Sequence, residues 1–169
     1  MAGGWRPMRV EDLDAVAAIS DSVHGAYTEA PPVYAERLRL YPAGCHVHLG
    51  TAAGDADRVT GYLVTHPWVR SHPPALGAML GALPQDADTY YLHDIALLPA
   101  ARGTGAGAAA VALVLDLARA AGFGDITLTA INGADRFWAA QGFAYVAPAE
   151  TPAALAGYGD AARWMRRTL

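Results

Sequence analysis

The sequence predicts an α/β domain that spans residues 1–169 and is built on a mixed β-sheet with helices on both faces. A chain of 169 residues has the length of one domain and can bury a sizeable core. Two observations carry the fold class: a hairpin of two strands in the first half, and strands that alternate with helices in the second half. Hairpins pair strands antiparallel, whereas strands joined through a helix can pair in parallel, so both arrangements are expected in one sheet.

The first part of the chain is expected to hold one strand and two helices. Residues 5–9 are expected to form the strand. Asp12 and Asp14 lie in the first turn of the next helix, where acidic side chains complement the partial positive charge of a helix N-terminus. The pair Pro31-Pro32 opens a second helix over residues 33–40, because proline is tolerated at the start of a helix.

A hairpin and a long connection follow these helices. Strands are expected at residues 45–52 and 59–65, and the turn between them contains Gly54-Asp-Ala-Asp57, which is a hairpin signal. The next segment, residues 66–88, is rich in Pro and Gly, with one or two helical turns expected around residues 76–83. It is long for a connection in a compact domain, and long connections are often functional.

The second half of the chain alternates strands and helices. A strong strand at residues 89–98 is followed by a glycine-rich turn and an apolar helix at residues 108–121. The remaining expected elements are strands at residues 126–130, 143–146 and 163–168 and a short helix at residues 134–140.

Composition and charge exclude several classes of partner. The chain carries 12 basic and 16 acidic residues with no basic cluster, so no nucleic acid is expected. Its longest apolar run, residues 106–115, is too short to span a membrane, and the N-terminus has no apolar signal core. Cys45 is the only cysteine, so we expect no disulfide within the chain and a cytoplasmic location. His46 and His48 lack a third ligand, which favours exposed strand histidines over a metal site.

The most informative segment is Arg102-Gly-Thr-Gly-Ala-Gly107, which lies between a strand and a long helix. Glycines let the backbone approach a ligand closely. A helix N-terminus adds free N–H groups and a partial positive charge. This combination predicts a site for a phosphate or pyrophosphate.

Two nucleotide-binding motifs compete for this turn. A P-loop requires Lys-Ser or Lys-Thr after its last glycine, but Ala108 follows here, which excludes it. The dinucleotide fingerprint G-x-G-x-x-A is met by Gly103, Gly105 and Ala108. That fingerprint begins directly at the end of its strand, whereas Pro99-Ala-Ala-Arg102 intervenes here, so a nicotinamide-dependent enzyme is a weak alternative.

The pattern Arg102-x-x-Gly105-x-Gly107 resembles the acetyl-CoA pyrophosphate loop of the GNAT N-acetyltransferase superfamily. Residues 132–143, Asn-Gly-Ala-Asp-Arg-Phe-Trp-Ala-Ala-Gln-Gly-Phe, are similar to a later segment of that family, although the alanine lies one place early. The opening segment, residues 6–14, also looks like the family's start, so the resemblance covers nearly the whole chain. It implies the GNAT fold: a mixed, mostly antiparallel sheet of six to seven strands flanked by about four helices.

The resemblance implies that acetyl-CoA binds as co-substrate and assigns residues to each part of it. The pyrophosphate would be held by the loop residues Arg102, Gly103, Thr104, Gly105, Ala106 and Gly107. The preceding strand splays from its neighbour in this family, so the pantetheine arm would pair with the backbone of Ile95, Ala96 and Leu97. A backbone N–H near Leu97 would polarise the acetyl carbonyl. Asn132 and Phe137 map to positions on the far side of the arm.

The implied reaction is the direct transfer of the acetyl group to a primary amine of a small molecule or a protein. The amine must be neutral to attack, so a base must accept its proton. The catalytic candidates are Tyr91, His93 and Asp94, and His93 is the best base by its unperturbed pKa of about 6.5. Strand alternation places Tyr91 and His93 on one face and Asp94 on the other. The alternative is that His93 and Asp94 form a hydrogen-bonded structural pair.

One position departs from the family's pattern. Trp138 stands where many members have a tyrosine that returns a proton to the CoA thiolate, and an indole N–H has no usable acidity. Tyr145, Tyr158, water or the outgoing amine proton would then serve, and Trp138 is interpreted as core or as a wall of the CoA channel. A non-catalytic acyl-CoA-binding or regulatory module of the same fold is therefore the alternative function.

The acceptor site is assigned by position. Tyr27, Glu29 and Glu36 lie where family members often build the acceptor pocket, and a carboxylate there would hold a cationic amine. Trp68, in the long segment 66–88, is assigned to the substrate site as part of a lid, with a solvated loop as the alternative. The expected partners are acetyl-CoA and an amine, without a metal, and a homodimer is left open.

Overall fold

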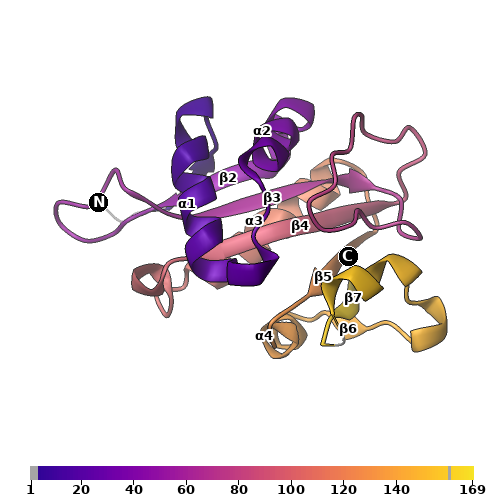
Figure 1. Ribbon diagram of the computed structural model, residues 1–169. Coiled ribbons are helices and arrows are strands. Elements are labelled where there is room, and N and C mark those ends of the chain that lie inside the picture. The colour runs from indigo at the N-terminus through magenta and orange to yellow at the C-terminus, as the bar shows by residue number, and fades with distance from the viewer. Residues whose placement is uncertain (1–3, 160) are drawn as a thin grey trace.

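The structure is a computed structural model, in which residues 4–159 and 161–169 are described. Over these residues seven strands form one sheet in the order β1-β2-β3-β4-β5-β7-β6 (Figure 1). The strands span Trp5–Pro7 (β1), Cys45–Leu49 (β2), Val59–Trp68 (β3), Thr89–Leu97 (β4), Asp125–Ala130 (β5), Ala144–Tyr145 (β6) and Arg163–Thr168 (β7). β4 and β5 pair in parallel, and every other neighbouring pair is antiparallel. The predicted mixed, mostly antiparallel sheet is confirmed.

Four α-helices in the described residues cover both faces of this sheet. They span Leu13–His24 (α1), Pro31–Leu40 (α2), Ala106–Ala120 (α3) and Asp135–Ala140 (α4). α1 and α2 lie in front of the strands in Figure 1, where Val16 and Tyr34 belong to one apolar cluster with Val64 of β3. On the opposite face, Val114 of α3 packs in a second cluster with Leu63. Helices on both faces are therefore confirmed as well.

Several observed boundaries differ from the expected ones. β1 ends at Pro7 because the Arg9 N–H donates to the Asp12 carboxylate at 2.7 Å, which begins the turn into α1. β3 extends to Trp68, where it pairs with Thr89. The helical turns expected at residues 76–83 do not form: residues 69–88, all described, contain only turns and bends.

The connection between β6 and β7 holds structure that the sequence did not suggest. Short 3-10 helices span Pro148–Glu150 and Ala153–Tyr158. Leu155 packs with Tyr91 and Trp164 in a third apolar cluster, which attaches this connection to the sheet.

β4 and β5 pair over a short stretch and then part. The paired residues are Tyr90 with Ile126, Tyr91 with Thr127, and Leu92 with Leu128. β4 nevertheless continues to Leu97. Beyond Leu92 its edge therefore has no β5 partner, and the sheet opens at its centre.

The opening begins at an irregularity in β4. Val64 of β3 pairs with Asp94, and Thr65 pairs with Leu92, so His93 is an extra residue opposite β3. A bulge of this kind bends its strand and increases the local twist. The bend coincides with the end of the β4–β5 pairing, which accounts for the parting of the two strands.

Candidate functional site

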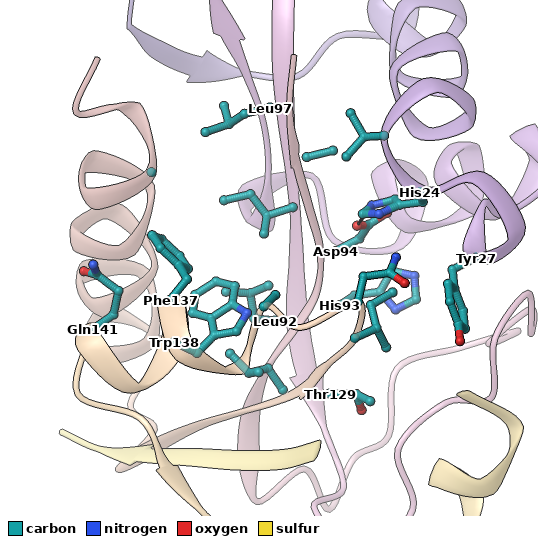
Figure 2. A pocket seen from close by; sticks show the side chains of 18 of the residues that line it. His24, Tyr27, Leu92, His93, Asp94, Leu97, Thr129, Phe137, Trp138 and Gln141 are labelled. Carbon is teal, nitrogen blue, oxygen red and sulfur yellow. Dashed lines mark hydrogen bonds and ion pairs between the residues drawn. The ribbon is translucent and has the colours of Figure 1, made fainter. Parts of the chain in front are cut away.

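A cavity of about 740 Å³ occupies the opening between β4 and β5 (Figure 2). Residues from both faces of the sheet line it, because the opening lets the cavity pass from one face to the other. The predicted site residues in its wall are Tyr27, Glu29, Tyr91, His93, Asp94, Ile95, Ala96, Leu97, Arg102, Gly103, Gly105, Gly107, Asn132 and Phe137. Thr104, Ala106 and Trp68 do not line it.

The glycine turn forms one end of the cavity, at the start of α3. Gly103 and Gly105 have positive φ angles of 71° and 88°, a conformation that favours glycine. The first backbone hydrogen bond into the helix runs from the Ala109 N–H to the Gly105 carbonyl. The N–H groups that precede it have no acceptor inside the helix, so they can bind an anion. Thr104 closes the turn, since its hydroxyl donates to the Ala101 carbonyl at 2.6 Å.

Arg102 braces this turn against the end of β4. Its Nε–H donates to the Leu97 carbonyl at 3.1 Å, and the side chain is otherwise exposed. This hydrogen bond links the end of β4 to the start of the glycine turn.

α4 closes the same side of the cavity. A Cβ built on Gly107 would lie 3.3 Å from Cζ of Phe137, so a side chain there would press on that ring. Phe137 is 40% exposed and lies on the wall opposite β4 in Figure 2. Among the described residues, Asn132 is the only non-glycine residue with a positive φ, 53°, a strained conformation that asparagine tolerates better than most residues.

Trp138 is both core and wall. It is buried, it makes edge-to-face contacts with Phe137 and Phe143, and it also lines the cavity. Tyr145 lies at the surface, where its hydroxyl donates to Asp135 at 2.7 Å, and it is absent from the cavity wall. Tyr158 lines the cavity.

The bulge at His93 overturns the expected facing of the β4 side chains. Alternation predicts that Asp94 points away from Tyr91 and His93. One extra residue in a strand reverses the facing of those that follow. Asp94 therefore lies on the side of α1 and α2, where it accepts hydrogen bonds from Tyr34 and Tyr62.

His93 pairs with Glu29, not with Asp94. His93 Nε2 lies 2.6 Å from Glu29 Oε1, and the two side chains are only 2% and 4% exposed. Burial raises the pKa of Glu29, but the charge and hydrogen bond of His93 and the Gly77 N–H outweigh it, so the pKa falls below its usual value. The carboxylate is ionised, and Nδ1 of His93 has no partner among the described residues.

Asp94 forms a second such pair, with His24 at the end of α1 (Figure 2). His24 Nε2 lies 2.7 Å from Asp94 Oδ1, while Oδ2 accepts from Tyr62 at 2.6 Å and Tyr34 at 3.0 Å. Burial lowers the pKa of His24, but the hydrogen bond and charge of Asp94 outweigh it and raise that pKa above 6.5. Burial likewise raises the pKa of Asp94, and His24 outweighs it and lowers that pKa.

His24 lines the cavity, although its sequence context does not indicate this. Its local sequence is that of an ordinary helix end, and Asp94 lies 70 positions away. Both oxygens of Asp94 are occupied by these partners, so Asp94 orients His24 and the two tyrosines and presents no free oxygen atom to a ligand.

Two expected acceptor residues serve other purposes in this structure. Glu36 does not line the cavity; its oxygens accept from the N–H groups of Leu80 at 2.6 Å and Gly81 at 3.0 Å. Trp68 lies outside the cavity, where its indole N–H donates to the His72 carbonyl at 2.6 Å. Both contacts fix the connection between β3 and β4.

Other expectations concern metals and membranes. His46 and His48 are buried, contrary to the expectation that they are exposed, and His48 Nδ1 lies 2.9 Å from the Thr60 hydroxyl. In the described ranges, no cluster of three or more His, Cys, Asp or Glu side chains has the geometry to hold a metal ion. None of the described helices is both long enough and apolar enough to cross a membrane.

Residues 15–143 match the sequence profile of a family described as the acetyltransferase (GNAT) family. Ard1 from Thermoplasma volcanium superposes with a TM-score of 0.72 at 20% identity, over 100% of this chain and 99% of that one. Naa50 of Arabidopsis thaliana, in complex with the bisubstrate analogue CoA-Ac-MVNAL, gives 0.67 at 14% identity over 100% of both chains. The loading GNATL domain of CurA from Lyngbya majuscula gives 0.77 at 12% identity, over 99% of this chain and 98% of that one. These low identities show a shared fold alone, and no curated protein sequence matches the chain.

Proposed function

Because the chain belongs to the acetyltransferase (GNAT) family, we propose that it transfers an acetyl group directly from acetyl-CoA to a primary amine. The observation that carries this proposal is the buried His93–Glu29 pair at the point where β4 and β5 part. This pair and the glycine turn line the same cavity, and we assign His93 the role of base and the turn the role of pyrophosphate site.

The donor would lie along the open edge of β4. We assign its pyrophosphate to the N–H groups of the turn at residues 103–107, with Arg102 as the brace. The pantetheine arm would pair with the backbone of Ile95, Ala96 and Leu97 as an added strand, in the space that β5 leaves free. Phe137 and Asn132 would contact the arm from the opposite wall.

The acceptor would reach the thioester from the face of α1 and α2. The neutral amine attacks the acetyl carbonyl carbon, its proton passes to His93, and the carbon–sulfur bond breaks as the thiolate leaves. Glu29 stabilises the imidazolium that forms, because its charge lies 2.6 Å away. The thiolate then takes a proton from water or the proton that left the amine, since Trp138 has no acidic proton to give and the Tyr158 hydroxyl already donates to the Pro74 carbonyl.

The bulge at His93 changes the expected position of the acetyl carbonyl of acetyl-CoA. The base and the oxyanion donor act on the same tetrahedral centre, so they must lie close together. Leu97 is four residues from His93, or about 13 Å along an extended strand. We therefore assign the polarising N–H to the bulge around His93, and not to the neighbourhood of Leu97.

The decisive experiment measures thiol release from acetyl-CoA with a panel of primary amines, together with mass spectrometry of the products. We expect release that depends on the amine and yields the N-acetylated product. Calorimetry with CoA is run in parallel. CoA binding with no turnover on any amine would favour the alternative of a non-catalytic acyl-CoA-binding module, which Trp138 supports, and binding of NAD(H) would favour a nicotinamide enzyme.

Two further assignments accompany this function. We propose a reducing, cytoplasmic location, which the buried and unpaired thiol of Cys45 supports. A homodimer remains a prediction, and light scattering on the purified chain measures it.

A further inference from the structure

We propose that the acceptor is a small primary amine with an apolar body, and that a polypeptide does not fit. This inference rests on the proposed function and concerns the half of the cavity on the α1 and α2 face. It is carried by a contact between two connections that meet over the His93–Glu29 pair.

The contact joins Tyr158 to the connection between β3 and β4. The Tyr158 hydroxyl donates to the Pro74 carbonyl at 3.0 Å, across 84 positions of sequence, and both groups are buried. Leu76, two residues further, lines the cavity together with Tyr158. The Gly77 N–H donates to Glu29 Oε2 at 2.7 Å, so the same segment is fixed to the catalytic pair itself. We call residues 74–77 and Tyr158 the roof.

Buried charges fix the segment that directly follows residues 74–77 of the roof. Besides the bonds of Glu36 to the Leu80 and Gly81 N–H groups, Arg37 donates from Nη2 to the Ala78 carbonyl at 2.9 Å. Arg37 is 1% exposed and forms an ion pair with Glu36 at 2.8 Å. Hydrogen bonds to charged groups are the strong ones in proteins, so this connection is a fixed wall despite its lack of regular structure.

The connection between α1 and α2 forms a third wall of this half of the cavity. A Cβ built on Gly159 would lie 3.1 Å from the Tyr27 hydroxyl, so the chain next to Tyr158 and the Tyr27 side chain are already in contact distance. A peptide acceptor needs an open groove in which several successive residues lie extended. Residues of three connections line this end of the cavity, and we infer that one compact group fits between them.

The chemistry of the walls identifies that group. The side walls are aromatic and aliphatic, and their members are Val23, Tyr27, Leu76, Tyr91, Ile131 and Tyr158. The ionised carboxylate of Glu29 lies beside His93 in this wall, and the other polar residues nearby are Thr129 and the pair of His24 with Asp94. Small-molecule sites with apolar walls and few polar groups orient a ligand through those groups. An amine nitrogen directed at His93, with an apolar body against the tyrosines, matches this arrangement.

The test compares kcat/KM for 2-phenylethylamine and hexylamine with that for a tetrapeptide that has a free N-terminus and for a lysine-containing peptide. We expect the small amines to be preferred by about 100-fold or more, as shaped enzyme pockets achieve. Equal or better rates with either peptide would overturn the inference while leaving the acetyltransferase function intact. Absence of turnover with both classes, with CoA still bound, would instead overturn the proposed function.

Two roof variants make the inference specific. Leu76→Ala should raise the peptide-to-amine ratio of kcat/KM by about 5- to 10-fold, and Leu76→Phe should lower kcat/KM for hexylamine more than for ethylamine. Met79→Ala is the matched control, because Met79 is an exposed residue of the same connection that does not line the cavity. CoA affinity confirms that each variant is folded. If the kcat/KM ratios between these substrates are unchanged in the Leu76 variants, the roof does not determine the size of the acceptor.

Discussion

His93 and Glu29 lie 64 positions apart in the chain and form a hydrogen bond of 2.6 Å inside the sheet opening. Both side chains are withdrawn from bulk water. A buried carboxylate is costly without a partner, and a buried imidazole gains a fixed orientation from one. Each residue therefore depends on the other, and the two should behave as one catalytic unit.

A double-mutant cycle measures that unit. His93→Gln should lower kcat/KM for an amine by about 10²- to 10⁴-fold, the range of general base catalysis. Glu29→Gln should lower it less, because the imidazole remains. The double variant should be no slower than His93→Gln, since residues that act together are not additive. CoA affinity should be unchanged in all three. Full activity in His93→Gln would exclude His93 as the base.

The second pair, His24 with Asp94, makes folding stability depend on pH. The folded-state pKa of His24 is raised above 6.5, so its contribution is complete below that pH and is lost as the pH rises through the raised value. The pKa of Asp94 is lowered below 3.8, so its contribution is lost only as the pH falls through the lowered value. The pair thus stabilises most between these two reference values.

His24→Gln checks this by thermal unfolding across the pH range. The difference in Tm from the unsubstituted chain should be largest near pH 5 to 6 and should shrink toward about pH 9. His46→Gln is the contrasting variant, because burial lowers the pKa of His46 and its linkage has the opposite sign. A Tm difference for His24→Gln that is constant with pH would show that the ion pair contributes nothing.

Gly105 and Gly122 have similar backbone angles, so substituting each of them distinguishes a loss of CoA binding from the effect of backbone strain. Gly105 at the start of α3 has φ 88°, and Gly122 just after its end has φ 84°; neither has an atom within 4 Å of a built Cβ. Substitution by Ala at either should reduce the free energy of unfolding by about 1–2 kcal/mol, the penalty of a left-handed L-residue. Only Gly105→Ala should also weaken CoA binding, measured by calorimetry. Equal CoA affinities in both variants would show that the glycine turn does not bind CoA.

Trp138 should matter for stability and not for proton transfer. Trp138→Phe should reduce the free energy of unfolding by about 1–3 kcal/mol, because the residue is buried in a core cluster as well as lining the cavity. Its kcat should change by less than about threefold, under 1 kcal/mol of barrier. A much larger loss of kcat in a variant that remains folded at the assay temperature would assign the indole a direct role.

The sequence predicted best what is local in the chain. The glycine turn, the helix after it and the strand before it are contiguous, so their residue types already predict this local structure. The mixed sheet followed in the same way from a hairpin and a strand–helix alternation. These features depend on neighbours in sequence, and the structure contains them.

The features it missed depend on distant contacts. One extra residue at His93 reversed the facing of Asp94, and no residue type in Leu92-His93-Asp94 signals a bulge. The partners of the two histidines lie 64 and 70 positions away. The bond from Tyr158 to Pro74 spans 84 positions. Only packing brings such groups together, so a single sequence does not reveal them.

The short pairing of β4 with β5 has a mechanical consequence. Across this junction the sheet is joined by three residue pairs, with β1–β4 on one side and β5–β7 on the other. A molecule bound along the free edge of β4 would contact both halves and supply interactions in place of the missing strand pairs. Binding of CoA should therefore reduce local opening in both halves of the sheet. Amide hydrogen exchange should slow in β5 and β7 as well as in β4 when CoA is added.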